Sequence, residues 1–149
     1  MNRAPHLLLV LAPYYAHLGA MLREGAEHAV AAAGATCELV TVPGAFEIPA
    51  AIGLAARHAP GRYDGYVGLG CVIRGETTHY DHVCAESARG MQDLAARDGL
   101  AVGFGILTCE NEAQALARAA PDGRDKGGEA VRACLALVEL KRRFLGNKT

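Results

Sequence analysis

The stretch HLLLVLA, residues 6–12, is a continuous run of apolar side chains with no polar alternation. Its length and composition predict a β-strand that is buried on both faces. Three further stretches have a similar character and are predicted strands: CELVTV (37–42), YVGLGCVI (66–73) and LAVGFGIL (100–107). Strands covered on both faces are typical of a parallel sheet with helices on each side.

Between the predicted strands, apolar residues recur at helical spacing. This pattern predicts helices over residues 18–33, 50–58, 80–98 and 112–119, with Gly34 ending the first. We expect a loop over 121–128 and then a last helix whose buried residues are Val131, Cys134, Leu135 and Val138. The alternation of strands and helices predicts one domain over residues 1–149, an α/β fold of the three-layer α/β/α, flavodoxin-like type with a four-stranded parallel sheet.

The composition excludes several classes of protein. A net charge of −1 does not suggest a nucleic-acid surface, and no apolar segment approaches the length of a membrane span. The first apolar run resembles a signal peptide, but it is short and Pro13 and Tyr14 supply no small-residue cleavage site, so a strand is the better interpretation. The five cysteines are scattered without a Cys-x-x-Cys pair, which argues against a zinc site or a disulfide framework and favours a reducing cytoplasm.

Ligands in folds of this type bind beyond the carboxyl ends of the strands. The first turn there, residues 12–17, has no Gly-x-Gly-x-x-Gly fingerprint, but Tyr14 offers a ring that either stacks on a flat heterocycle or packs over the edge of the core. The second turn, PGAFEIP (43–49), contains Gly44, which lets a ligand approach the backbone. Glu47 lies near a helix start, where a carboxylate by itself is more typical of a helix cap.

The third turn, GCVIRGETTHYD (70–81), carries the most chemistry. A glycine-containing loop with two threonines leads into a helix, and backbone N–H groups and hydroxyls at a helix N-terminus suit a phosphate. Because Gly-Lys-[Ser/Thr] is absent, the turn is not a nucleotide P-loop. An isolated histidine near a helix start, such as His79, more commonly has a capping or packing role, but beside a bound anion an imidazole can move protons near neutral pH. Arg118 and Lys126 belong to a solvated surface unless an anion lies nearby.

Five motifs together resemble the successive signatures of lumazine synthases. They occur in the family's order and cover the chain from the first strand to the last helix: PGAFEIP, GCVIRGETTHYD, GILTCEN (105–111), QALARA (114–119) and DKGGEA (125–130). The resemblance implies condensation of 5-amino-6-(D-ribitylamino)uracil with 3,4-dihydroxy-2-butanone 4-phosphate, without a metal or organic cofactor. Two alternatives are a non-catalytic flavin- or lumazine-binding protein on the same scaffold and a flavodoxin-like signalling domain. The second predicts acidic residues at the strand ends, where this chain has Ala-Pro-Tyr-Tyr.

The resemblance also implies a role for each matching residue. Tyr14 would stack on the pyrimidinedione, and His79 would transfer protons. The remaining substrate contacts would come from two groups. In the same subunit these are Ala45, Phe46, Glu47, Cys71, Val72, Ile73, Glu76 and Thr77, of which the last two would bind the phosphate. From the adjacent subunit they are Phe104, Arg118 and Lys126, of which Arg118 would bind the phosphate.

The chain departs from the family pattern in two places near the site and one at the surface. Pro13 and Tyr15 stand where Arg and Asn are common, and Cys71 stands where Thr is frequent. Relatives that assemble into sixty-subunit shells tend to have Gly-Asn-Lys before the last helix, whereas here Pro121 begins a different turn. Only about five residues precede the first strand, too few to add a strand to a neighbour's sheet. We therefore expect a homopentamer, with a shell as the alternative.

Overall fold

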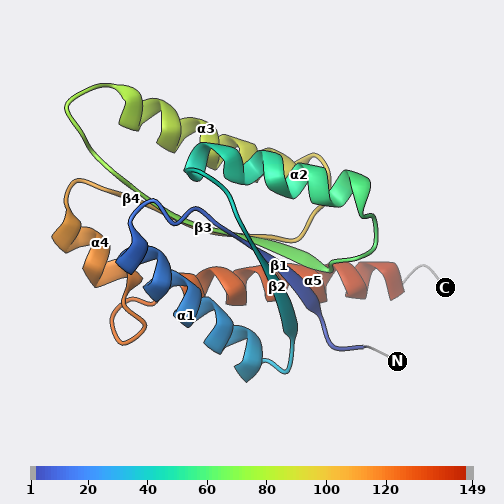
Figure 1. Cartoon of the computed structure of the whole chain (residues 1–149). Coiled ribbons are helices and arrows are strands. Elements are labelled where there is room, and N and C mark those ends of the chain that lie inside the picture. Colours follow the sequence, from blue (N-terminus) through green and yellow to red (C-terminus); the bar gives the residue numbers. More distant parts are fainter. Residues whose placement is uncertain (1–2, 147–149) are drawn as a thin grey trace.

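The structure is a computed structural model that describes residues 3–146. Strands and helices alternate along most of the chain (Figure 1). In chain order the elements are β1 (His6–Leu11), α1 (Ala16–Ala32), β2 (Thr36–Thr41), the 3₁₀ helix η1 (Ala45–Glu47), α2 (Ile48–His58), β3 (Gly65–Ile73), α3 (His79–Ala96), β4 (Val102–Cys109), α4 (Glu112–Ala119) and α5 (Lys126–Gly146).

The four strands form one parallel sheet in the order β2-β1-β3-β4. Figure 1 shows α2 and α3 on one face of this sheet and α1, α4 and α5 on the other. The predicted three-layer α/β/α, flavodoxin-like fold with a four-stranded parallel sheet is therefore confirmed. The run predicted as a strand over residues 6–12 forms β1, which ends one residue earlier, at Leu11.

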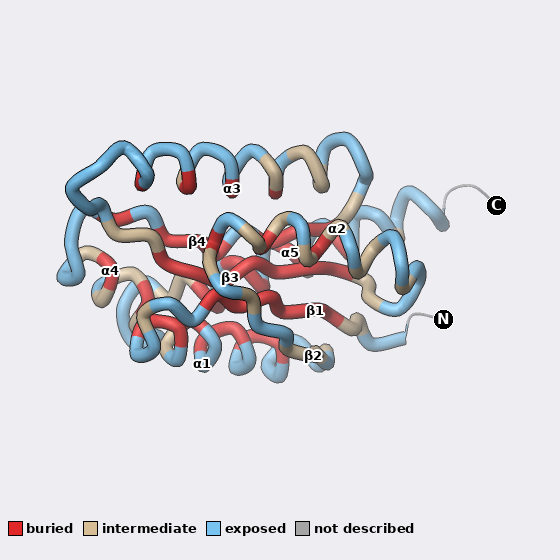
Figure 2. Tube along the Cα trace, turned by 45° about the horizontal axis from the view of Figure 1, so that its top comes forward, coloured by how far each residue is buried: buried red, intermediate tan, exposed pale blue. Residues whose placement is uncertain are grey.

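Each face of the sheet has its own hydrophobic core, and β1 contributes to both. Leu7, Leu9 and Leu11 pack against the layer of α1, α4 and α5, whereas Leu8 and Val10 pack against the layer of α2 and α3. Figure 2 shows the consequence: β1 and β3 are buried along most of their length, and the helices are buried only on the sides that face the sheet.

Strand β2 differs from the expectation that every strand is covered on both faces. None of its residues is fully buried, and Val40 retains 41% of its exposure. The physical reason is that β2 lies at an edge of the sheet and has little helical cover, since α1 alone packs appreciably on it; β4, at the other edge, is covered by α3, α4 and α5. Its sequence TCELVT, with polar residues interspersed, suits an edge strand.

The predicted loop over 121–128 is wrong at its end, because α5 already begins at Lys126. The helix start is capped by Asp125, whose side chain accepts a hydrogen bond from the Gly128 N–H at 3.2 Å. Asp125 has a φ of 48°, a left-handed conformation that aspartate tolerates better than most residues. A Cβ at Gly127 would collide with the carbonyl oxygen of Leu22, so the glycines let α5 approach α1 rather than break the helix.

The other boundaries differ by a few residues. The helix predicted over 50–58 starts at Ile48, that over 80–98 is His79–Ala96, and the strand predicted over 100–107 is Val102–Cys109. Gly34, with a φ of 70°, follows α1 as predicted. Leu135 is half-buried rather than buried, whereas the other three predicted core residues of α5 are buried. Within residues 3–146, no helix combines the length and apolar character that crossing a membrane requires.

The close approach of α5 to α1 predicts that Gly127→Ala destabilises the protein. The added methyl meets backbone rather than a movable side chain, so we expect a loss of about 1–3 kcal/mol in the free energy of unfolding, measured by urea denaturation. Gly53→Ala is the matched control, since its Cβ would meet only Leu94 at 3.9 Å within helix α2. That variant should gain about 0.5–1 kcal/mol from helix propensity. Equal stability of the two variants would contradict the packing described for Gly127.

Candidate active site

A cleft of about 610 Å³ lies at the carboxyl edge of the sheet. It is formed by the turns that follow β1, β2 and β3, together with the first turns of α3, which is where ligands bind in folds of this class. The residues that line it are Tyr14, Tyr15, Pro43, Gly44, Ala45, Phe46, Glu47, Cys71, Val72, Ile73, Gly75, Thr77, His79, Tyr80 and Val83.

Two adjacent tyrosines form one wall of the cleft. The Tyr14 and Tyr15 rings meet edge to face, with centroids 5.0 Å apart and an interplanar angle of 77°. Tyr15 packs against the core beneath α1, whereas Tyr14 is 76% exposed. A ring with that exposure is not packing over the edge of the core, so its face is available to a flat ligand.

The second wall comes from the turn after β2. Gly44 has an extended backbone, η1 follows it, and Phe46 is 55% exposed beside the cleft. Glu47 occupies the N-cap position of α2, yet its side chain makes no capping hydrogen bond. The interpretation of Glu47 as a cap therefore does not describe its side chain, whose Oε1 lies close to Gly44 at the cleft.

The turn after β3 brings His79 to the cleft at the first residue of α3. The Thr77 hydroxyl accepts a hydrogen bond from the His79 N–H at 3.3 Å, whereas the N-cap residue Thr78 makes no side-chain capping hydrogen bond. His79 is exposed, and it is the one histidine among the described residues that line the cleft.

Few side chains that are charged at neutral pH line the cleft. Burial, together with a smaller effect of the neighbouring Cys109, raises the pKa of the Cys71 thiol to about 12, so Cys71 is neutral and a poor nucleophile. Among the described residues that line the cleft, none is Lys or Arg. No group of three His, Cys, Asp or Glu side chains within residues 3–146 is arranged to hold a metal ion.

Four of the predicted site residues do not line this cleft. Glu76 is an exposed residue of the turn, between Gly75 and Thr77, which both line it. Phe104 is 46% exposed on β4, the opposite edge of the sheet from β2. On α4, Arg118 donates a hydrogen bond to the Gln114 carbonyl at 3.0 Å. On α5, Lys126 pairs with Glu129 at 3.0 Å.

Some lining residues were absent from the predicted site. Tyr80 and Val83 are buried beneath it on α3, and Tyr15, Pro43, Gly44 and Gly75 belong to the turns already singled out. Tyr80 and Val83 are three residues apart, so they lie on one face of the helix that begins at His79. This spacing could have predicted that they form the floor of the cleft.

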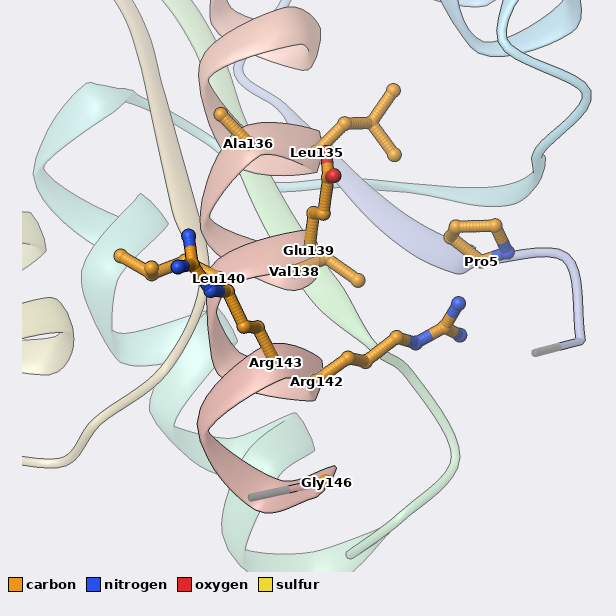
Figure 3. Close-up of a pocket in the computed structure, with 9 residues that line it drawn as sticks. All are labelled: Pro5, Leu135, Ala136, Val138, Glu139, Leu140, Arg142, Arg143 and Gly146. Atoms are coloured by element: carbon orange, nitrogen blue, oxygen red, sulfur yellow. The ribbon is translucent and has the colours of Figure 1, made fainter. Parts of the chain in front are cut away.

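A larger hollow of about 840 Å³ lies along α5, away from the strand ends that form the cleft (Figure 3). It is bounded by Pro5, which precedes β1, and by residues of α5 that include Arg142 and Arg143. The Arg142 guanidinium is already engaged, since it donates to the Arg3 carbonyl at 2.9 Å and pairs with Asp64 at 3.6 Å. None of the described residues that line the hollow is aromatic or a histidine, in contrast to the cleft.

Comparison with known proteins identifies relatives over nearly the whole chain. Residues 4–142 match the family model described as 6,7-dimethyl-8-ribityllumazine synthase. A protein of that name from Sphingopyxis alaskensis is 57% identical over 139 residues, which cover 93% of this chain and 96% of the relative. The 6,7-dimethyl-8-ribityllumazine synthase 1 of Rhizobium meliloti is 53% identical over 96% of this chain and 95% of its own. The 6,7-dimethyl-8-ribityllumazine synthase of Agrobacterium fabrum is 51% identical over 95% of this chain and 98% of its own.

The burial of Cys71 predicts slow alkylation. With its pKa near 12, the thiolate fraction at pH 8 is roughly a thousandfold below that of an unperturbed cysteine. Treatment of the native protein with iodoacetamide, followed by peptide mass spectrometry, should modify the half-buried Cys37 well before Cys71. In urea both should react at similar rates. Fast modification of Cys71 in the native protein would contradict this description of the cleft wall.

Proposed function

This chain belongs to the 6,7-dimethyl-8-ribityllumazine synthase family, and on that premise we propose that the cleft at the carboxyl edge of the sheet is its active site. The enzyme is a transferase of riboflavin biosynthesis. It condenses 5-amino-6-(D-ribitylamino)uracil with 3,4-dihydroxy-2-butanone 4-phosphate to give 6,7-dimethyl-8-ribityllumazine, phosphate and water. The observation that supports the location best is that Tyr14, Glu47 and His79 come from three separate turns and line one cleft.

The uracil substrate fits the two walls formed by the first and second turns. Tyr14 stacks on the pyrimidinedione, which its exposed ring supports. Ala45, Phe46 and Glu47 hold the same substrate, with the Glu47 carboxylate accepting hydrogen bonds from the ribityl hydroxyls. The main chain at the end of β3, from Cys71 to Ile73, lines the ring, so the neutral thiol of Cys71 takes no part in the chemistry.

The phosphate of the second substrate lies at the start of α3. Glu76 and Thr77 offer main-chain N–H groups there, Thr77 adds its hydroxyl, and the helix N-terminus favours negative charge. The uracil amine attacks the ketone to form an imine with loss of water, phosphate leaves by elimination, and the ribitylamino nitrogen closes the ring. Each stage moves a proton, and His79 is the residue we assign to this work.

The cleft is completed by an adjacent subunit. A phosphate that is both ligand and leaving group needs a cation, and the described lining of the cleft contains no Lys or Arg. Arg118, Lys126 and Phe104 lie outside the cleft of their own chain and are the residues we assign to the neighbour's site, with Arg118 on the phosphate.

The assembly we propose is a homopentamer. Its support is that exposed apolar side chains occur near both edges of the sheet: Phe46 and Leu54 on one side, and Phe104, Leu137 and Leu140 on β4 and α5. Two different surfaces that meet head to tail close into a ring. The turn that begins at Pro121 differs from that of shell-forming relatives, which favours a ring over the shell of roughly sixty subunits.

Further parts of the proposal concern the whole chain. Residues 1–149 form one catalytic domain, since both cores are built on the same sheet. Condensation by proton transfer requires neither a metal nor an organic cofactor. The five cysteines carry no disulfide, which is in keeping with a cytoplasmic enzyme. A protein that only binds flavin has no use for His79 beside a phosphate site, so the catalytic function is favoured.

Kinetics of two variants test the division of labour at this site. With both substrates and a chelator present, the wild-type enzyme should form the lumazine, followed by its absorbance. His79→Ala should lower kcat by about 10²-fold or less, because proximity supplies much of the acceleration. Arg118→Ala should chiefly raise KM for the butanone phosphate, since one charge-assisted hydrogen bond is worth about 1.5–3 kcal/mol.

The control is His82→Ala, an exposed histidine on the same helix that does not line the cleft, which should keep wild-type rates. No product above the slow uncatalysed condensation would refute the proposed function. An equal loss of affinity for both substrates in Arg118→Ala would refute the role of Arg118.

The shared site predicts both an assembly and a rescue. Light scattering after size exclusion should give a mass near five chains, and a particle of about sixty chains at neutral pH would refute the pentamer. Inactive His79→Ala and Arg118→Ala subunits, once mixed and reassembled, should regain partial activity because some interfaces pair two intact halves. Absence of rescue, with subunit exchange demonstrated, would place the whole site in one chain.

A further inference from the structure

Arg74 is the first residue after β3, at the point where the turn toward His79 begins. Its main-chain N–H donates to the Cys109 carbonyl at 2.9 Å, which fixes this residue beside the end of β4. Its guanidinium carbon lies 4.4 Å from the centroid of the Tyr80 ring, a cation–π contact with a side chain that lines the floor of the cleft.

The same guanidinium makes two further contacts, one with α3 and one with the turn after β4. Its Nε donates to Glu110 Oε2 at 2.7 Å, in the turn between β4 and α4, and its Nη1 donates to Asp81 Oδ1 at 3.5 Å. Tyr80 and Asp81 directly follow His79 in the first turn of α3. One side chain therefore holds the helix start that carries His79 against the strand ends.

The contacts continue beyond Glu110 to the residue assigned to the neighbouring site. The Glu110 N–H donates to the Gln114 side chain at 2.9 Å. The Gln114 carbonyl in turn accepts the hydrogen bond from Arg118 at 3.0 Å. The position of Arg118 on α4 is thus connected through Gln114 and Glu110 to Arg74, and through Arg74 to the start of α3.

These contacts matter more for position than for stability. Ion pairs between partly exposed side chains contribute little to the stability of a fold. A catalytic group that moves by about 1 Å can lose on the order of a hundredfold in rate. From the end of β3, the Arg74 guanidinium contacts both α3 and the turn after β4. Because this group is planar, its contacts fix direction as well as distance, which suits it to holding a catalytic group in position.

We propose that Arg74 is a positioning residue, which orients His79 through Tyr80 and Asp81 and orients Arg118 through Glu110. This inference rests on the proposed function, in which His79 transfers the proton and Arg118 binds phosphate. Arg74 itself does not line the cleft and is assigned no contact with substrate.

Arg74→Met tests the role, since methionine keeps an unbranched stem but loses the three directed contacts. We expect kcat to fall about tenfold, with KM for the uracil substrate within about twofold of wild type. Arg74→Lys, which keeps the charge but not the fork, should recover only part of the rate. The matched control is Arg89→Met on α3, whose guanidinium also pairs with two carboxylates, but with Glu86 and Asp93 of its own helix and not with the turn after β4. It should keep wild-type kinetics.

Glu110→Gln provides the second arm and remains informative if Arg74→Met does not fold. It should lower kcat severalfold. The kcat of the double variant should be no lower than that of Arg74→Met alone, because both substitutions remove the same contact between Arg74 and Glu110. Wild-type kcat in Glu110→Gln, or kinetics of Arg74→Met equal to those of Arg89→Met, would overturn the inference. If the wild-type protein forms no lumazine, the proposed function fails instead. If the wild type is active and His79→Ala is impaired, a negative result for the Arg74 variants counts against the role of Arg74 alone.

Discussion

The burial of β1 on both faces is the constraint on which the rest of the structure depends. Its side chains from Leu7 to Leu11 are buried, and alternate ones belong to different cores. Both faces therefore need a layer of helices, and the chain reaches each next strand through a helix, which makes all the strands parallel. Parallel strands end at one edge, so the turns after β1, β2 and β3 meet there and form the cleft.

The charges of that edge support the proposal that an adjacent subunit completes the site. The cleft contains ring faces, a carboxylate and an imidazole, but none of its described lining residues is a permanent cation. The guanidinium of Arg74, in the adjoining turn, is already paired with Glu110 and Asp81. On the proposed function, a phosphate bound by one chain alone would be held only by dipoles, so the proposal links catalysis to assembly through charge.

The amino-acid sequence predicted the fold and the main residues of the cleft well because both follow local patterns. Apolar runs predicted the strands, and the motif around His79 identified the turn with the most candidate site residues. The extension of α5 back to Lys126 was not predictable, because two glycines usually favour a loop. Their helical state depends on Asp125 and on the distant Leu22. The partial exposure of β2 was missed for a similar reason: edge position is a property of the strand order, and no single strand carries it. The contacts of Arg74 likewise join residues separated along the chain.

The strand order has a consequence for co-translational folding on the ribosome. β1 leaves the exit tunnel first, but its neighbour β3, where Gly65 pairs with Leu7, is made much later. The core on the α1 side also needs Val131 and Cys134 of α5, the last helix that the structure describes. The pairing of β1 with β2 can form early, but its pairing with β3 and its cover by α5 cannot. Until α5 has been made, apolar side chains of β1 lack part of their final cover, which favours aggregation of an incomplete chain.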